Sequence, residues 1–260
     1  SVLPTVIARD TTVQLDASGN ASITAGDVDN GSSDNCGNVT LDVAPSAFTC
    51  VNVGDNNVTL TVTDDNGNTN TALAIVTVED NTAPTALARD ITVQLNASGN
   101  VSILASEVDN DSSDNCGVTS LSVVPDSFTC SNVGSNNVML TVTDASGNFA
   151  SATATVTVVD SVLPTVIVRA ITVQLDASGN ASITAAAVDN GSSDACGIAS
   201  LTISKETFDC SNVGPNTVTL TVTDNNNNVI TKDATVTVED NIIPVVYFFP
   251  KFRPQGRGGS

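Results

Sequence analysis

The chain has 260 residues, with 28 acidic and 8 basic side chains and a formal net charge of −20. It contains no histidine, which excludes His-ligated metals and imidazole-based nucleophiles, and so few bases argue against binding nucleic acid through its phosphates. Hydrophobic residues make up 40% of the chain, too many for simple disorder, and no apolar run approaches the roughly 20 residues of a membrane span. No initiator methionine or signal peptide opens the sequence, so we expect Ser1 to be a cut end.

The sequence repeats itself at a fixed offset of 80 residues. "SVLPTVIARDTTVQLDASGNASIT" begins at Ser1, "NTAPTALARDITVQLNASGNVSIL" at Asn81 and "SVLPTVIVRAITVQLDASGNASIT" at Ser161. Self-similarity of this kind marks a repeat architecture. We therefore predict three domains, 1–80, 81–160 and 161–240, followed by a tail, 241–260.

The first unit shows how each domain is built. Apolar residues alternate with polar ones over 13–15, 21–25, 39–43, 58–62 and 76–78, and turn-forming segments rich in Asp, Asn and Gly lie between. Such alternation predicts half-buried antiparallel strands, and no window shows helical spacing. About seven short strands in 80 residues predict an all-β fold, with three tandem immunoglobulin-like sandwiches in a linear array and one strand in the tail.

The six cysteines come as one pair per unit, 14 positions apart and without a CxxC motif. The fixed spacing predicts one disulfide inside each unit: Cys36 with Cys50, Cys116 with Cys130, and Cys196 with Cys210. Closing a loop of ~15 residues stabilises a domain by ~3 kcal/mol in the chain-entropy model. Disulfides also indicate a location outside the cytosol. A phenylalanine stands two residues before the second cysteine of each pair and is expected to anchor the core, at Phe48, Phe128 and Phe208.

The second half of each unit resembles a known family. The pattern "F-x-C-x-N-V-G-x-N-x-V-x-L-T-V-T-D" with a later "T-V-T-V-x-D" and proline is similar to the hyaline repeat (HYR) domain. The cysteine pair with "SSDNCG" resembles a variant from long repeat arrays of bacterial surface proteins. The resemblance implies an immunoglobulin-like extracellular module involved in adhesion, without enzymatic activity. The junction "VEDNTAP" at 78–84 is also similar to, though shorter than, the calcium-binding linker of cadherins.

Acidic residues cluster where one unit should meet the next. Alternate loops of such a sandwich gather at opposite poles, so the exit of one unit should approach two loops of the following unit. We expect Glu79 and Asp80 to lie near Asp109, Asp111, Asp114 and Asp144, and Asp160 to lie near Asp189, Asp194 and Asp224. Further loop acids complete the candidate metal ligands: Asp27, Asp29, Asp34, Asp64 and Glu107.

Calcium is the cation that these acids would suit, because it takes about six to eight oxygen ligands. The alternative is surface acidity that serves solubility, since Asp and Asn are also ordinary turn residues. The second junction has lost two acids, with Val159 in place of Glu79 and Ala187 in place of Asp27. We therefore expect calcium to stiffen the first junction more than the second.

The tail breaks the composition of the repeats. "NIIPVV" opens it as a fourth repeat would, and aromatic and basic residues follow before a Gly-rich end. It is either a loose end or an interaction strand that packs on another subunit and builds head-to-tail filaments. The residues of this candidate assembly strand are Ile242, Val245, Tyr247, Phe248, Phe249 and Phe252.

Function follows from repetition. Nearly identical copies favour a structural role, an extended extracellular stalk or a filament of a cell-surface fibre. The partners would be further copies of the chain or neighbouring repeats of a longer one. The alternative is an adhesive module whose loops recognise glycan or protein, although aromatic platforms are scarce in 1–240. Repetition of the unit in triplicate argues against a single active site, so we expect no enzyme.

Overall fold

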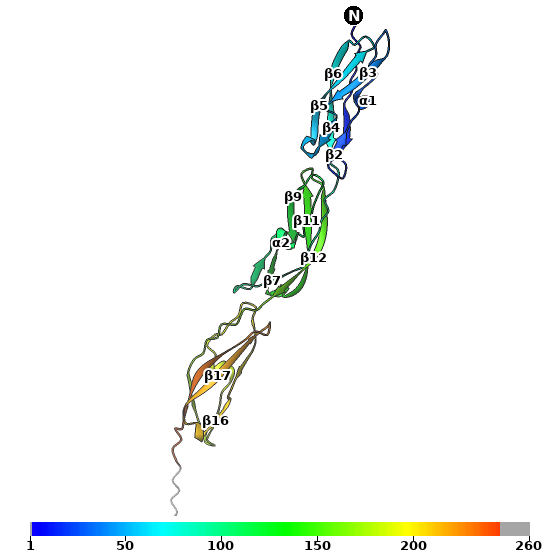
Figure 1. Cartoon of the computed structure of the whole chain (residues 1–260). Helices are drawn as coiled ribbons and strands as arrows, with labels where there is room; N and C mark the ends of the chain where they lie inside the picture. Colours follow the sequence, from blue (N-terminus) through cyan, green and yellow to red (C-terminus); the bar gives the residue numbers. More distant parts are fainter. Residues whose placement is uncertain (1, 245–260) are drawn as a thin grey trace, which may run out of the picture. The chain divides into compact units, whose positions relative to one another are not determined.

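A computed structural model describes residues 2–244 and shows the same order of strands three times over (Figure 1). The elements of the first repeat are β1 Thr11–Gln14, β2 Asn20–Ser22, α1 Ala25–Val28, β3 Val39–Ala44, β4 Ala47–Thr49, η1 Cys50–Asn52, β5 Gly54–Asp64 and β6 Thr69–Glu79. Those of the second are β7 Ile91–Gln94, β8 Asn100–Ser102, α2 Ala105–Val108, β9 Val118–Val124, β10 Ser127–Thr129, η2 Cys130–Asn132, β11 Gly134–Asp144 and β12 Phe149–Val159. Those of the third are β13 Ile171–Gln174, β14 Asn180–Ser182, α3 Ala185–Val188, β15 Ile198–Ile203, β16 Thr207–Asp209, η3 Cys210–Asn212, β17 Gly214–Asp224 and β18 Val229–Glu239.

Each repeat is an all-β sandwich of immunoglobulin type. In the first repeat a four-stranded sheet has the order β1-β6-β5-β3, and a two-stranded sheet pairs β2 with β4. Strand β1 runs parallel to β6, while the other pairs are antiparallel. The long β5–β6 hairpin between β1 and β3, facing a separate β2–β4 pair, is the strand order of this fold. The predicted fold class is therefore confirmed as all-β tandem immunoglobulin-like sandwiches.

Two details of the sequence prediction are wrong. Each described repeat has six strands instead of about seven, and Ala25, expected in a strand, begins the single turn α1. In this turn both the backbone N–H and the hydroxyl of Thr24 donate to the Asp27 carboxylate, each at 2.7 Å, whereas α3 forms the same turn with Ala187 at that position. The capping box of Thr24 and Asp27 therefore supports the helical turn but is not required for it.

The core lies between the two sheets of each repeat. In β5 the inward residues Val58, Leu60 and Val62 are at most 1% exposed, because alternate residues of a strand point to the same face. The predicted aromatic anchors are confirmed, since the phenylalanine of the short second sheet is buried in all three repeats, at Phe48, Phe128 and Phe208.

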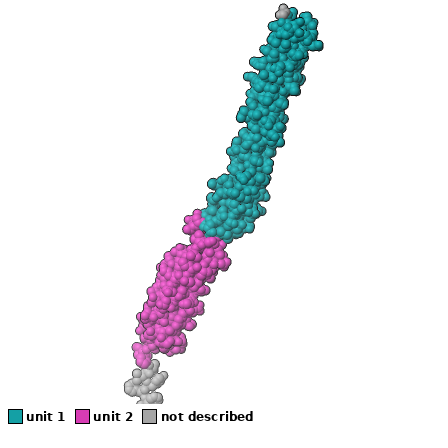
Figure 2. Space-filling model, viewed as in Figure 1, with its two compact units in different colours: residues 1–95, 100–159 teal, residues 96–99, 160–260 magenta. Residues whose placement is uncertain are grey.

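The described chain forms two compact units (Figure 2). One unit consists of residues 1–95 and 100–159 and contains the sheets of the first two repeats. The other consists of residues 96–99 with the chain from Asp160 onwards, and it contains the third repeat. Among the predicted assembly residues only Ile242 is described, and it is 45% exposed. Val245, Tyr247, Phe248, Phe249 and Phe252 lie outside the described residues.

Candidate metal centre

Cys50 and Cys116 join two repeats instead of closing loops within them. Cys50 is bonded to Cys116 of the second repeat, with 5.3 Å between the Cα atoms, whereas Cys36 and Cys210 are free and exposed. Cys130 and Cys196 are also disulfide-bonded. The predicted pairs Cys36–Cys50, Cys116–Cys130 and Cys196–Cys210 are therefore wrong.

The strands explain why the predicted pairs cannot form. Cys50 stands four residues before the start of β5, whereas the loop of Cys36 lies at the far end of β5, where Asn38 N–H donates to the Asp65 carboxylate at 3.0 Å. The 11 residues of β5 span about 35 Å at about 3.3 Å per residue. A disulfide needs Cα atoms closer than about 7 Å, so the two cysteines of one repeat are at opposite poles and out of reach.

Beside the Cys50–Cys116 disulfide, three carboxylates converge. Oxygens of Asp80, Asp114 and Asp144 all lie within 4.8 Å of one another. Asp80 follows the last strand of the first repeat, Asp114 lies in the loop before β9, and Asp144 ends β11. We call this set the junction cluster. Asp80 is 4% exposed and Asp144 is 3% exposed, so both carboxylates are largely withdrawn from water.

Hydrogen bonds satisfy only part of the junction cluster. Asp80 Oδ1 accepts from Thr82 N–H at 3.2 Å and from the Asn115 side-chain amide at 3.3 Å. One oxygen of Asp114 accepts from Cys116 N–H at 2.8 Å. Three buried oxygens have no hydrogen-bond partner: Asp80 Oδ2, Asp114 Oδ1 and Asn115 Oδ1. Buried polar atoms are almost always paired, so these three point to a missing partner.

The Asp144 carboxylate of the junction cluster accepts hydrogen bonds from its own turn. Its Oδ1 accepts from the N–H groups of Ser146 and Asn148, at 2.9 and 2.8 Å, and its Oδ2 accepts from the Asn148 side-chain amide at 2.8 Å. The same Asn148 amide also donates to the backbone carbonyl of Asp80 at 2.9 Å. The turn after β11 therefore contacts the end of the first repeat through the Asn148 side chain.

Charge makes the junction cluster unfavourable without a cation. Two unit charges 4.8 Å apart repel by about 3 kcal/mol at an effective dielectric constant of about 20. A divalent cation would reverse that repulsion. The donor set contains only carboxylate and amide oxygens, which suit a hard cation such as Ca²⁺. The unpartnered carboxylate oxygens of Asp80 and Asp114 therefore suit calcium as ligands.

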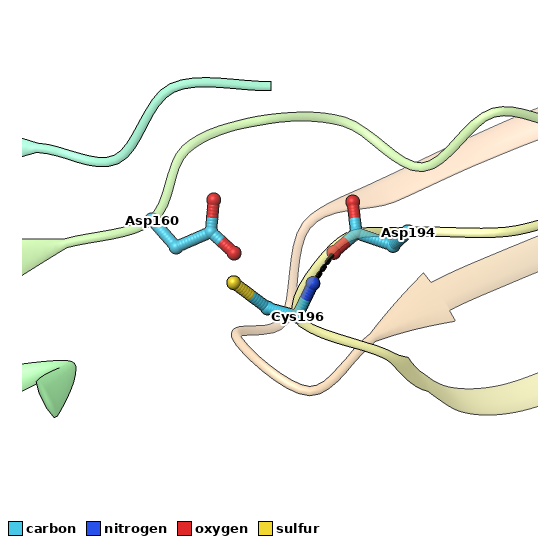
Figure 3. A group of neighbouring side chains, drawn as sticks. All are labelled: Asp160, Asp194 and Cys196. Carbon is cyan, nitrogen blue, oxygen red and sulfur yellow. Dashed lines mark hydrogen bonds between the residues drawn. The ribbon is translucent and has the colours of Figure 1, made fainter. Parts of the chain in front are cut away.

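The third repeat carries a related but poorer group, Asp160, Asp194 and Cys196 (Figure 3). Figure 3 shows the Asp160 carboxylate facing the Cys196 sulfur, while Asp194 accepts from Cys196 N–H at 2.7 Å. Asp160 Oδ2 is buried without a partner. Cys196 is disulfide-bonded, so its sulfur is not a thiolate ligand. Ala195 replaces Asn115 here, which removes the amide oxygen of the first cluster.

Many other candidate ligands accept hydrogen bonds outside the junction cluster. Glu79 accepts from Gln14 Nε2 at 2.6 Å, and Asp109 accepts from Ser112 N–H at 3.2 Å. Asp111 adopts a left-handed backbone with φ of 61°. None of these three belongs to the junction cluster as the described residues define it. The remaining predicted residues hold loop hydrogen bonds: Asp27, Asp29, Asp34, Asp64, Glu107, Asp189 and Asp224.

The pKa values agree with this local role. The backbone N–H and hydroxyl of Thr24 lower the pKa of Asp27. Burial works to raise the pKa of Asp29, but hydrogen bonds from the side chain and backbone of Ser32 lower it overall. The Asn68 side-chain amide and nearby backbone N–H groups lower the pKa of Asp64. Each carboxylate is stabilised in its charged form by the turn that it closes.

Sequence reasoning missed Asn115. It donates to Asp80 and also to the backbone carbonyl of Asp16 at 3.1 Å, so it contacts the first repeat at two points. Asparagine is common in turns for backbone reasons, and this hides such a contact. The available signal was the exchange at one repeat position, where Asn35 and Asn115 become Ala195.

No protein-family model and no curated protein sequence matches the chain. Cadherin domains 1–4 of Protocadherin Gamma B7 match at 11% identity and a TM-score of 0.36, over 90% of this chain and 75% of that one. An I-band fragment of titin matches at 9% identity and a TM-score of 0.40, over 92% and 99% of the two chains. Immunoglobulin domains 1–4 of Sidekick-1 match at 10% identity and a TM-score of 0.35, over 91% and 76%. Function has to be argued from this chain's own residues.

Across residues 2–244 there is no helix with the length and apolar character needed to cross a membrane.

Proposed function

We propose that the chain is a structural segment of an extracellular repeat protein, a stalk whose first two repeats are fixed to each other by calcium. One observation carries the proposal: the junction cluster buries two unpartnered carboxylate oxygens, one from the end of the first repeat and one from a loop of the second, beside a disulfide that joins the same two repeats. A junction built in this way resists bending, which is what a spacer requires.

The location outside the cytosol is supported by the disulfides. Cys50–Cys116 and the bonded state of Cys130 and Cys196 need an oxidising compartment, because cytosolic reductants keep such thiols reduced. Free calcium is also abundant outside cells, and extracellular modules bind it with dissociation constants of about 10⁻⁴ to 10⁻³ M. The same compartment therefore favours the disulfide and the occupied metal centre.

The adhesive alternative has weaker support. Glycan recognition usually uses exposed aromatic rings, and within 2–244 the exposed aromatic side chain is Phe149, at 68% exposure. Where an aromatic side chain lines a described cavity, it is the buried Phe48 or Phe208. A structural role explains the junction contacts, whereas loop recognition leaves them without a purpose.

Calcium binding can be tested on the intact chain by titration calorimetry and by thermal unfolding with calcium or a chelator. At a free calcium concentration of about 100 times Kd, binding to one site adds about 2.7 kcal/mol of stability. We expect Asp114→Asn to weaken binding at least tenfold, because it removes charge from the junction cluster while keeping an oxygen and the shape of the side chain. Magnesium should stabilise less, because it demands octahedral geometry and keeps its water.

The repeat supplies a matched control. Asp34 occupies the position of Asp114 in the first repeat and makes the same contact, accepting from Cys36 N–H at 2.9 Å, but it is not part of the junction cluster. Asp34→Asn should leave the tightest calcium site unchanged. Equal loss in both variants would show that surface acidity, not the junction, binds the ion. Identical unfolding of the intact chain in calcium and in chelator would overturn the calcium proposal.

A further inference from the structure

Two thiols of the chain are exposed and free, Cys36 and Cys210. Each has a counterpart in the other repeats that is oxidised. Cys116 and Cys196 share the repeat position of Cys36, Cys50 and Cys130 share that of Cys210, and all four are disulfide-bonded. We propose that Cys210 of one copy of the chain forms a disulfide with Cys36 of a second copy, so that copies link head to tail in the manner of Cys50 with Cys116.

The surroundings of Cys210 match those of Cys50, which is disulfide-bonded. Cys50 begins the turn η1 and Cys210 begins η3. The Cys50 sulfur lies 3.8 Å from the carbonyl oxygen of Gly19, and the Cys210 sulfur lies 3.8 Å from that of Gly179. A Cβ added at Gly19 would stand 2.6 Å from the Cys50 sulfur, and one at Gly179 would stand 2.8 Å from the Cys210 sulfur. The Cys210 side chain is thus placed as Cys50 is in its disulfide.

The acceptor side repeats the loop of Cys116. Cys36 N–H donates to Asp34 at 2.9 Å, as Cys116 N–H donates to Asp114 at 2.8 Å. The difference is the surroundings. Cys116 packs against the core cluster of the first repeat, whereas Cys36 is exposed and lines an open cavity of about 420 Å³ together with Asp34 and Asp64. The first repeat covers the loop of Cys116, whereas the equivalent loop of Cys36 is open to a partner.

The second copy also needs space next to the proposed Cys36–Cys210 contact. Val2, Leu3 and Pro4 correspond by the repeat to Ile242, Ile243 and Pro244 of the donor, so the two segments compete for one route. Ile243 is 84% exposed and Ile242 is 45% exposed. The described part of the donor segment is therefore not packed into a core.

The bond forms by thiol–disulfide exchange with a small-molecule disulfide, for which glutathione disulfide is the probe. The Cys210 thiolate attacks one sulfur of glutathione disulfide and releases one glutathione thiolate, which leaves a mixed disulfide. The Cys36 thiolate of the second copy attacks the Cys210 sulfur and displaces the second glutathione. Two protein thiols are oxidised to one disulfide, and one glutathione disulfide is reduced to two thiols.

The test uses the full chain at high concentration with glutathione disulfide, followed by non-reducing electrophoresis and peptide mapping. The intact chain should give a ladder of covalent oligomers in which the peptides of Cys36 and Cys210 are linked. Cys36→Ser and Cys210→Ser each retain one free thiol, so each alone should give no covalent oligomer. Mixed together they should give a dimer and nothing larger, because one complementary pair of thiols remains.

The outcomes separate a built contact from chance oxidation. Dimers of Cys36→Ser alone or of Cys210→Ser alone would show that exposed thiols pair without regard to position, and would overturn the proposal. So would an intact chain that stays monomeric, or one that links Cys36 to Cys210 only within a single chain. Running each reaction in calcium and in chelator keeps this result apart from the calcium centre: linkage in either condition supports the disulfide proposal.

Discussion

Removing the Cys50–Cys116 disulfide should lower the free energy of unfolding by an amount that depends on how many residues separate the two cysteines. The variant is Cys50→Ser together with Cys116→Ser, so that no new free thiol remains. The two cysteines are 66 residues apart, and in the chain-entropy model a cross-link over that distance stabilises the folded state by about 4 kcal/mol at 25 °C. The closed loop holds all of β5 and β6 of the first repeat together with β7 and β8 of the second. The loss should therefore fall on these two repeats.

The assay is urea unfolding followed by far-ultraviolet circular dichroism, since the chain has no tryptophan. Cys210→Ser is the matched control, because Cys210 has the same local position as Cys50 but closes no loop. That substitution should change the free energy of unfolding by less than about 0.5 kcal/mol. Equal losses in the control and the double variant would place the effect in the cysteine site and not in the cross-link. No loss in the double variant would refute the entropic reasoning.

Two further outcomes follow from the core and the loops. Phe128→Ala should cost about 3–5 kcal/mol in urea unfolding, because Phe128 is 1% exposed, whereas Phe149→Ala at an exposed position should stay within about 0.5 kcal/mol. The folded pKa of Asp64 is lowered by Asn68, so its charge stabilises the fold above the unfolded pKa of about 4, and that contribution is lost as the pH falls towards the folded pKa. The intact chain and Asp64→Asn should then converge in thermal stability on acidification, and a gap that persists at low pH would contradict this role.

The fold could be predicted because the alternation of apolar and polar residues is a local pattern and occurs in all three repeats. Alternating Val58, Leu60 and Val62 predicts a strand with one buried face, and the structure buries all three. The strand prediction failed where the chain forms a turn that the alternation of apolar residues does not show. Ala25 continues the alternation of its strand, yet the chain turns there, with the Thr24–Asp27 hydrogen bonds within the turn.

The site was predictable only in part. Loops at opposite poles imply that Asp80 meets a loop of the second repeat, and the structure brings Asp80, Asp114 and Asp144 together, while their role as ligands stays a prediction. Glu79 was expected to join them, but Gln14 lies across the strand pair and takes its carboxylate. Spacing alone gave the wrong disulfides, because a separation of 14 residues says nothing about the long strand that holds the two poles apart.

The disulfide and the acidic cluster of the first two repeats both lie at the junction between them. Asp34 and Asp114 have the same neighbours in sequence, the same turn and the same hydrogen bond to a cysteine N–H. Asp34 lines an open cavity, whereas Asp114 keeps a buried oxygen without a partner because the first repeat covers it. Covering one pole with the end of another repeat turns an ordinary loop carboxylate into a candidate ligand and an exposed thiol into a cross-link. An isolated repeat should therefore have neither the cross-link nor the junction cluster.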